Sequence, residues 1–303
     1  MSDIMLPKFP KDFKYRNLAE ATEVTETAEK GVYTGSLHAD WCIGVVPHGG
    51  YLTSVLLNAS ATYFNKYHAD QPDAIHISQT FSTRCSIGPF RLTVVPIKIG
   101  RQYSFVRVEL FQGKHLCLTA VVTHASFAQE AASKGLNGPE MVPKPRYITP
   151  FEECEGQEPK GRGADFRVAE KKLNYRFPKG TVYGSRGNEL RREQWVSFAD
   201  GKDIMPTDLG MISDMFIPLP INLAPLSPNG ERMVTSWYPT LWLSLEVKKP
   251  GPWRWVGVFV EIKKLENGRS DIEVIITDEK GELIGLSRHL AIVVSIARNN
   301  AKL

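Results

Sequence analysis

The sequence has few cysteines and no long apolar run. Its four cysteines, Cys42, Cys85, Cys117 and Cys154, lie too far apart for a Cys-x-x-Cys pair and are too few to crosslink 303 residues. No segment approaches the roughly 18 apolar residues of a membrane span, and the N-terminus lacks the apolar stretch of a signal peptide. We therefore expect reduced thiols in a cytoplasmic or other intracellular protein that does not act at a membrane.

The sequence also lacks a strong excess of one charge. It contains 37 Lys and Arg against 33 Asp and Glu, a formal net charge of +4. The densest basic segment, residues 186–192, is short, so we expect no nucleic-acid partner. The 20 prolines, 24 glycines, 14 Phe, 10 Tyr and 6 Trp indicate strands and turns rather than a helical bundle.

Three motifs of common enzyme classes are missing. There is no phosphate-binding GxxxxGK[ST] loop, and the glycines at 161–163 do not make a dinucleotide fingerprint. A GxSxG nucleophile elbow is absent. The seven histidines form no HExxH, and His115 with Cys117 is an isolated pair. The sequence therefore predicts no cofactor and no metal.

The N-terminal part of the chain has a strand, a helix and then several strands. After an N-terminal extension over 1–30, apolar residues at helical spacing predict a helix over 47–68. Alternating β-branched and aromatic residues then predict strands over 74–85, 89–100, 103–112 and 114–127. We expect this domain to span 31–127, followed by a Pro- and Gly-rich linker over 128–194.

A C-terminal domain over 195–303 repeats this order. A strand is predicted over 194–201 and a helix over 207–219, followed by strands over 233–248, 253–265, 270–281 and 282–297. Moving the first half along by 160 residues carries Gly50 onto Gly210 and Thr80 onto Thr240, and Gly113 corresponds to a second hairpin glycine, Gly281. The sequence predicts a duplicated α+β fold, in which each antiparallel sheet wraps a helix.

Polar residues in the second half suggest a site. Asp214 lies in an apolar segment, where a carboxylate is costly to bury unless it is hydrogen-bonded or lines a cavity. Alternation places Ser236, Tyr238 and Thr240 on one face of the following strand, and His289 shares a face with Ser287 on the last strand. These residues carry catalytic potential only where they converge on Asp214. Singly, a strand hydroxyl or a lone histidine is more often a structural residue, whereas the apolar surroundings of Asp214 favour a functional carboxylate over one that caps a short helix or faces solvent.

His48, Gly49, Gly50 and Tyr51 form the other candidate. They open the predicted helix, whose free backbone N–H groups could bind an acyl carbonyl oxygen if the glycines let a ligand approach. From spacing alone, the glycines are equally well explained by a tight turn between strand and helix.

The chain resembles the thioesterase-like superfamily with a double hotdog fold, the relatives of acyl-CoA thioesterase II. The resemblance rests on W-x-I-G-x-x-P-H-G-G-Y-L from Trp41, on GMISDMF around Asp214, on PTLWLSLEV from Pro239, and on DEKGELIGLSRHLAIV from Asp278. It implies a tandem pair of hotdog domains, each a long helix wrapped by an antiparallel sheet, and hydrolysis of an acyl thioester such as an acyl-CoA.

The resemblance also implies residue roles. In that family an Asp, a Ser or Thr and a Gln activate water, which here corresponds to Asp214, to Ser236 or Thr240, and to a position occupied by His289. Because His can exchange protons and Gln cannot, three outcomes stay open. They are hydrolysis with an altered partner, another reaction such as dehydration or cyclisation of a polyketide-like substrate in secondary metabolism, and a non-catalytic protein that binds an acyl ligand.

Two further expectations concern location and assembly. The C-terminal residues Ala301, Lys302 and Leu303 resemble the S-K-L peroxisomal address, and the family resemblance makes a peroxisomal location plausible. Chains of two hotdogs commonly pair further, and an open sheet edge favours pairing, so we expect a homodimer.

Overall fold

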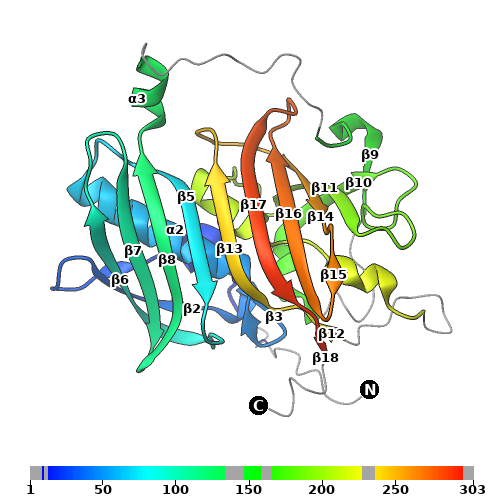
Figure 1. Cartoon of the computed structure of the whole chain (residues 1–303), viewed down its shortest axis with the longest axis horizontal. Coiled ribbons are helices and arrows are strands. Elements are labelled where there is room, and N and C mark those ends of the chain that lie inside the picture. Colours follow the sequence, from blue (N-terminus) through cyan, green and yellow to red (C-terminus); the bar gives the residue numbers. More distant parts are fainter. Residues whose placement is uncertain (1–8, 10–12, 134–146, 158–165, 227–235, 296–303) are drawn as a thin grey trace.

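The computed structural model of the chain describes residue 9 and residues 13–133, 147–157, 166–226 and 236–295. A single antiparallel sheet of fourteen strands dominates the fold, with the pairs β3–β4 and β12–β18 outside it. Figure 1 shows the sheet running across the molecule from β6 to β10. The expected peroxisomal tripeptide at 301–303 lies outside the described residues.

Most of the regular structure is strand. The helices, with η marking 3₁₀ turns, are α1 (Leu18–Ala21), η1 (Ala39–Trp41), α2 (Gly49–Tyr67), α3 (Phe127–Ala132), η2 (Phe151–Glu153), η3 (Val168–Lys172), η4 (Pro206–Asp208), α5 (Leu209–Ile212) and η5 (Leu219–Leu223). The strands are β1 (Thr25–Glu26), β2 (Val32–Leu37), β3 (Cys42–Ile43), β4 (Val46–Pro47), β5 (Asp73–Phe81), β6 (Gly88–Lys98), β7 (Ser104–Gln112), β8 (His115–Ala125), β9 (Cys154–Gly156), β10 (Leu173–Pro178), β11 (Arg191–Phe198), β12 (Ser236–Trp237), β13 (Thr240–Val247), β14 (Val256–Glu261), β15 (Leu265–Glu266), β16 (Arg269–Thr277), β17 (Leu283–Ile292) and β18 (Val294–Ser295).

The two halves of the sheet have the same internal strand order. The order β2-β6-β7-β8-β5 in the first half matches β11-β14-β16-β17-β13 in the second, and the halves join where β5 pairs with β13. In Figure 1 the cyan strand β5 accordingly lies beside the yellow strand β13. Gly113 and Gly281 have φ angles of 58° and 76° in equivalent hairpins. The repeated order of elements predicted from the sequence is confirmed.

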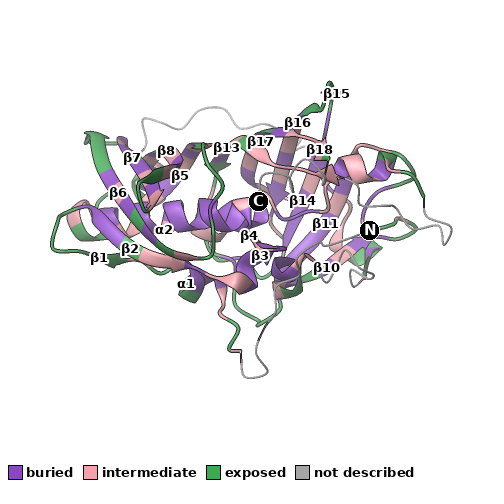
Figure 2. Ribbon diagram, turned by 90° about the horizontal axis from the view of Figure 1, so that it is seen from below, coloured by how far each residue is buried: buried purple, intermediate pink, exposed green. Residues whose placement is uncertain are grey.

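Helix α2 matches the helix predicted over 47–68, and most of it is buried. It packs against β5, β6, β7 and β8, and Figure 2 shows it in purple beneath the sheet. The expected N-terminal extension covers part of α2, because Tyr51 Oη donates to the Ala21 carbonyl at 2.8 Å and Asn58 Nδ2 donates to the Thr22 carbonyl at 2.9 Å. Burial on all these sides explains why the amphipathic pattern of α2 is weak.

The long helix predicted over 207–219 is wrong. The α-helix in this segment, α5, spans four residues and follows the 3₁₀ turn η4. Pro206 occupies the start of η4. At the end of α5, Ser213 Oγ donates to the Gly210 carbonyl at 3.0 Å, and the Asp214 N–H, which would bond to that carbonyl in a longer α-helix, points to the Met211 carbonyl instead. An equally long helix in each half is therefore not present in the described residues.

Helices α2 and α5 cross with almost no side chain between them. A Cβ added to Gly50 would lie 2.7 Å from the Met211 carbonyl oxygen, and one added to Gly210 would lie 2.8 Å from the Ser54 backbone nitrogen. Ser54 Oγ links α2 to the segment of α5 by two hydrogen bonds. It accepts from the Met211 N–H and donates to the Thr207 carbonyl, both at 2.9 Å. The two glycines that the repeat placed in register are thus the contact points of the two helices.

The segment 128–194, expected as a linker, contains strands of the sheet. Strands β9 and β10 pair with each other and β10 pairs with β11, which already begins at Arg191. β9 has only three residues and gives no pattern, whereas β10 alternates apolar and polar residues from Leu173 to Phe177, a strand signal that the Pro- and Gly-rich surroundings concealed. Among the described residues, none of the helices combines the length and the apolar character that a membrane span requires.

We expect Gly210→Ala to destabilise the protein, because its added methyl group would meet backbone atoms of α2 that cannot rotate away. Overpacking of this kind costs about 1–3 kcal/mol, measurable as a lower midpoint of urea unfolding. Gly156→Ala is the matched control, because its nearest neighbour would be the Tyr175 carbonyl oxygen at 3.9 Å. Equal midpoints for the two variants would contradict a glycine-dependent helix crossing.

Candidate functional site

Asp214 lies in the turn directly after α5, and two long side chains fix this turn. Gln194 Nε2 on β11 donates to the Met215 carbonyl at 2.7 Å, and Arg167 Nη2 donates to the Phe216 carbonyl at 2.9 Å. The Asp214 side chain is only 13% exposed. Sequence reasoning missed both residues. Arg167 lies in the expected linker, and Gln194 binds a backbone carbonyl of another element, a contact that leaves no pattern in the sequence.

Two histidines face the Asp214 carboxyl group. His48 Nε2 lies 3.7 Å from Oδ2, and His289 Nδ1 lies 3.5 Å from Oδ1. Gly49 completes the close packing, since an added Cβ would lie 2.6 Å from Asp214 Oδ2. The structure thus brings together three predicted site residues, Asp214, His48 and His289, from the end of α5, the start of α2 and strand β17.

The hydrogen bonds of His48 define which ring nitrogen carries its proton. His48 is the N-cap of α2, and its Nδ1 accepts from the Gly50 N–H at 3.2 Å. A neutral ring that accepts at Nδ1 carries its hydrogen on Nε2. His48 therefore points an N–H group towards Asp214.

His289 has the opposite arrangement with respect to Asp214. Ser287 Oγ uses its own hydrogen on the Ser244 carbonyl, at 2.6 Å, and lies 2.9 Å from His289 Nε2. Because that hydroxyl hydrogen is already donated, Ser287 accepts from His289 Nε2, and neutral His289 then has a lone pair on Nδ1. His289 therefore points an acceptor towards Asp214.

Burial displaces the titration of all three groups. It raises the pKa of Asp214 to about 7, although the Gly50 N–H and the positive charge of Arg167 oppose the rise. Burial also lowers the pKa of His48 and of His289 to about 3 each. Near neutral pH the two rings are uncharged, while the carboxyl group is divided between its acid and its carboxylate.

The other residues of the His48–Tyr51 turn have structural contacts. Gly49 and Gly50 lie against Asp214 and α5, so close protein contact requires them whether or not a ligand approaches. Tyr51 is fully buried and its hydroxyl is bound to Ala21, so its ring packs under the N-terminal extension. The free N–H groups at the start of α2 still give this turn a positive end.

Ser236, Tyr238 and Thr240 do not share one continuous strand. Ser236 belongs to the short pair β12–β18, and Pro239 separates it from β13. Burial raises the pKa of Tyr238, and a hydrogen bond with Ser236 opposes this rise. Within the described ranges, neither Ser236 nor Thr240 forms a hydrogen bond with Asp214.

A bulge decides which face Thr240 occupies. The register of β13 shifts between Thr240 and Trp242, so Thr240 lies opposite Ala291 while Leu243 lies opposite His289. Opposite residues share a face, which puts Thr240 on the interior face as a diagonal neighbour of His289, about 7–8 Å away. Regular alternation would have placed Thr240 with Trp242 on the other face, so Thr240 reaches the face of His289 only because of the bulge.

Gln79 on β5 is a buried polar residue that the sequence reasoning did not single out. Its Nε2 donates to Thr53 Oγ1 at 2.5 Å, and Thr53 donates in turn to the Gly49 carbonyl at 3.0 Å. Gln79 Oε1 is buried without a hydrogen-bond partner. Since Gln79 shares its side of β5 with buried Ile77, a polar residue at an apolar position was the available signal.

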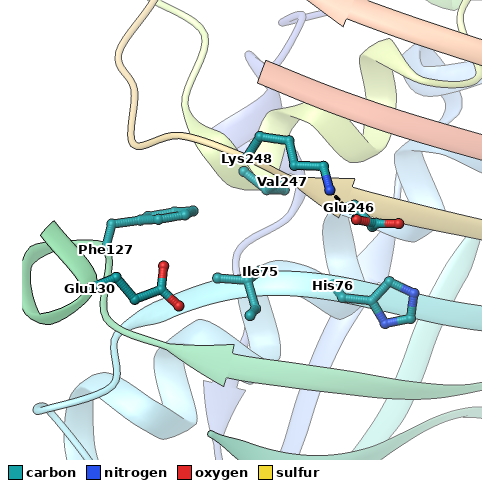
Figure 3. A pocket seen from close by; sticks show the side chains of 7 residues that line it. All are labelled: Ile75, His76, Phe127, Glu130, Glu246, Val247 and Lys248. Atoms are coloured by element: carbon teal, nitrogen blue, oxygen red, sulfur yellow. Dashed lines mark hydrogen bonds and ion pairs between the residues drawn. The ribbon is translucent and has the colours of Figure 1, made fainter. Parts of the chain in front are cut away.

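A separate hollow of about 330 Å³ lies over the junction of β5 and β13. Figure 3 shows it between Phe127 and Glu130 of α3 and the side chains of His76 and Glu246, with Lys248 bound to Glu246. Asp214, His48 and His289 do not line this hollow. No group of three or more His, Cys, Asp or Glu side chains in the described part of the chain is placed to bind a metal ion.

Family models match both halves of the chain. Residues 37–125 match the acyl-CoA thioesterase N-terminal domain and residues 151–293 match the acyl-CoA thioesterase C-terminal domain. The thioesterase-like protein TwmA from Talaromyces wortmannii is 27% identical over 338 aligned positions, covering 94% of each chain.

Solved structures show a similar fold. A protein of unknown function with a hot dog fold from Alicyclobacillus acidocaldarius superposes with a TM-score of 0.74 at 13% identity, covering 93% of this chain and 99% of its own. Acyl-CoA thioesterase II TesB2 from Mycobacterium marinum superposes with a TM-score of 0.65 at 14% identity, covering 93% and 100%. The antiparallel sheet with few helices is therefore a hot dog fold.

We expect the neutral ring of His289 to carry its hydrogen on Nε2, because Ser287 Oγ can only accept there. The ¹⁵N shifts of the ring report this tautomer directly. Ser287→Ala removes the acceptor and should populate the tautomer with hydrogen on Nδ1, which Asp214 can accept. Ser270→Ala on β16, also buried, is the control and should change nothing. Hydrogen on Nδ1 in the unmodified protein would contradict the assignment.

Proposed function

This chain belongs to the acyl-CoA thioesterase family, and we propose that it hydrolyses an acyl thioester with Asp214 as the general base. The observation that carries this proposal is the buried Asp214 carboxyl group between an N–H of His48 and the Nδ1 acceptor of His289. A base whose pKa lies near the working pH transfers protons most efficiently. Burial brings Asp214 to that range.

The reaction begins with water. The Asp214 carboxylate takes a proton from a water molecule while the oxygen of that water attacks the carbonyl carbon of the thioester. The product of this step is a tetrahedral alkoxide. The dipole of α2, whose N-terminus His48 caps through the Gly50 N–H, supplies positive potential for this oxygen. When the carbon–sulfur bond breaks, the protonated Asp214 returns the proton to the departing thiolate, so that the products are a carboxylic acid and a thiol and Asp214 is regenerated.

His48 and His289 position the base and the water in this proposal. The Nε2–H dipole of His48, 3.7 Å from Oδ2, favours the ionised carboxylate, while Nδ1 of His289 can accept a hydrogen bond from the second O–H of the attacking water. Thr240, on the same interior face as His289, is the hydroxyl best placed to orient the water. Ser236, bonded to Tyr238 outside the main sheet, is the weaker candidate.

A proton-transfer reaction on the acyl chain is a second candidate. Asp214, with a pKa near 7, could remove a proton from the acyl chain and return it to a departing hydroxyl in a dehydration, while neutral His289, 3.5 Å away, orients the substrate as a hydrogen-bond acceptor. Product masses from one assay separate the candidates, because hydrolysis releases thiol and free acid while dehydration leaves a thioester lighter by one water. Binding without any product would indicate a protein that only holds acyl ligands.

We expect kcat/KM for thioester hydrolysis to rise as the pH increases through about 7, because Asp214 must be ionised to act as a base. Asp214→Asn cannot accept the proton and should lose roughly 10²-fold or more. Thiol release, followed with a colorimetric thiol reagent, measures both. Asp208→Asn is the matched control, since Asp208 accepts from the Met205 N–H at 2.9 Å and does not face the histidines. Unchanged activity of Asp214→Asn would refute the proposal.

We expect His289→Gln to move the same pH profile to lower pH. The Gln amide can donate to Asp214, whereas His289 offers only a lone pair, and a donor favours the ionised carboxylate. His124→Gln is the control, because His124 is also fully buried but stacks on Phe64. A midpoint that stays in place, or that rises, would show that His289 does not face Asp214 as an acceptor.

A further inference from the structure

Gln79 is a buried glutamine that uses only half of its amide group. It is 1% exposed on β5, and its Nε2 donates to Thr53 Oγ1 at 2.5 Å. The other amide atom, Oε1, is buried and has no hydrogen-bond partner among the described residues. Burying an unpaired polar atom is costly, so Oε1 is a place where a ligand with an O–H or N–H group can bind.

Thr53 determines which end of the Gln79 amide faces α2. The Thr53 hydroxyl donates its own hydrogen to the Gly49 carbonyl at 3.0 Å, so it can only accept from Gln79. Bonds of this kind distinguish the nitrogen of an amide from its oxygen. Nε2 therefore faces Thr53, and Oε1 keeps both of its lone pairs for a donor.

Gln79 lies in the same row of the sheet as His289. On the interior face Gln79 is opposite Leu243 of β13, and Leu243 is opposite His289 of β17. Figure 1 shows these three strands side by side. Neighbouring strands are about 4.8 Å apart, so the backbones of Gln79 and His289 are roughly 10 Å apart. The row thus has a hydrogen-bond acceptor at each end, Gln79 Oε1 and His289 Nδ1, with an apolar residue between them.

Helix α2 brings the Gln79 amide close to Asp214. Thr53, which binds this amide, follows Gly49 by four residues, roughly 6 Å along the helix axis. A Cβ added to Gly49 would lie 2.6 Å from Asp214 Oδ2 and 3.6 Å from the ring of Phe81, which shares its face of β5 with Gln79. The Gln79 amide is therefore about one helical turn away from the Asp214 carboxyl group.

The surroundings of Gln79 are apolar. Ile77 on the same face of β5 and Leu243 on β13 are fully buried, and Ala120, opposite Gln79 on β8, is 1% exposed. An acyl chain is compatible with such surroundings, whereas a thiol arm that contains amide groups would bury further polar atoms there. The donor for Gln79 Oε1 therefore belongs to the acyl side of a thioester rather than to the thiol side.

We propose that Gln79 is a specificity-determining residue, whose Oε1 accepts a hydrogen bond from a hydroxyl group on the β-carbon of the acyl chain. The proposal rests on the thioester hydrolysis proposed above and names the class of acyl group that the site takes. A carbonyl carbon attacked from Asp214 and a hydroxyl two carbons further along the chain match the separation of one helical turn. The preferred substrates are then thioesters of β-hydroxy acids, because an unsubstituted chain leaves Oε1 unpaired.

A pair of substrates tests the role of Gln79. The measured quantity is kcat/KM for the β-hydroxyoctanoyl thioester of ethanethiol divided by kcat/KM for the octanoyl thioester of the same thiol. This ratio should exceed one in the unmodified protein and fall roughly tenfold in Gln79→Met, which has a similar volume and only a weak acceptor. A purely structural effect of the substitution would change both rate constants alike and leave the ratio in place.

Gln71→Met is the matched control. Gln71 is 2% exposed, its Nε2 donates to the Gly100 carbonyl at 2.6 Å, and its Oε1 also lacks a partner among the described residues. It follows the C-terminal end of α2 at Tyr67, the end opposite to Gly49 and Asp214. This variant should keep the substrate ratio of the unmodified protein.

Binding provides a measurement that requires no turnover. N-ethyl amides of the two acids have nitrogen in place of sulfur and resist hydrolysis. Calorimetry should show tighter binding of the β-hydroxy amide to the unmodified protein, and equal binding of the two amides to Gln79→Met. Gln79→Glu should keep the preference, because its buried neutral acid donates to Thr53 and retains an acceptor oxygen. If this preference is found while no thioester is hydrolysed, the proposed hydrolysis fails and the hydroxyl site stands.

Three results would overturn the hydroxyl site. They are a substrate ratio of one in the unmodified protein, a ratio that Gln79→Met leaves unchanged, and an equal fall of the ratio in Gln71→Met. A fourth would assign the donor to the thiol arm and also overturn the proposal. It is a loss in Gln79→Met that appears with N-acetylcysteamine thioesters, which contain an amide, and is independent of the acyl hydroxyl.

Discussion

The contact between α2 and α5 at Gly50 and Gly210 is the constraint on which the site depends. The backbones of the two helices are in direct contact at these glycines, and this contact places the turn after α5 beside the N-terminus of α2. Gly49 then leaves space for the Asp214 carboxyl group, which a methyl group would block. The same approach removes water from Asp214 and raises its pKa. The helix packing and the raised pKa of Asp214 therefore have one structural cause.

The two histidines differ in what they present to this carboxyl group. His48 offers a hydrogen because its other nitrogen caps α2, whereas His289 offers a lone pair because Ser287 holds its hydrogen. The Asp214 carboxyl group thus lies 3.7 Å from a ring nitrogen that carries hydrogen and 3.5 Å from one that does not, and neither ring is charged near neutral pH.

Much of the fold and part of the candidate site could be predicted from the local spacing of apolar and polar residues. Helix α2, four strands of the first half and the repeated order follow from periodicity, and the chemistry of Asp214 and His289 drew attention before their positions were known. Other features depend on contacts that pattern does not contain. The Ser213 hydroxyl occupies the Gly210 carbonyl where α5 ends, a bulge after Thr240 turns that side chain inward, and Pro- and Gly-rich surroundings concealed the short strands β9 and β10. Gln79 was missed because its partner, Thr53, lies on another element.

The most direct measurement is the titration of the Asp214 carboxyl carbon by ¹³C NMR, with Asp214→Asn to assign its signal. Burial between two uncharged rings predicts a midpoint near 7, with no change of charge on His48 or His289 across the same range. A midpoint near 3.8, the ordinary value for aspartate, would contradict a desolvated general base at the end of α2.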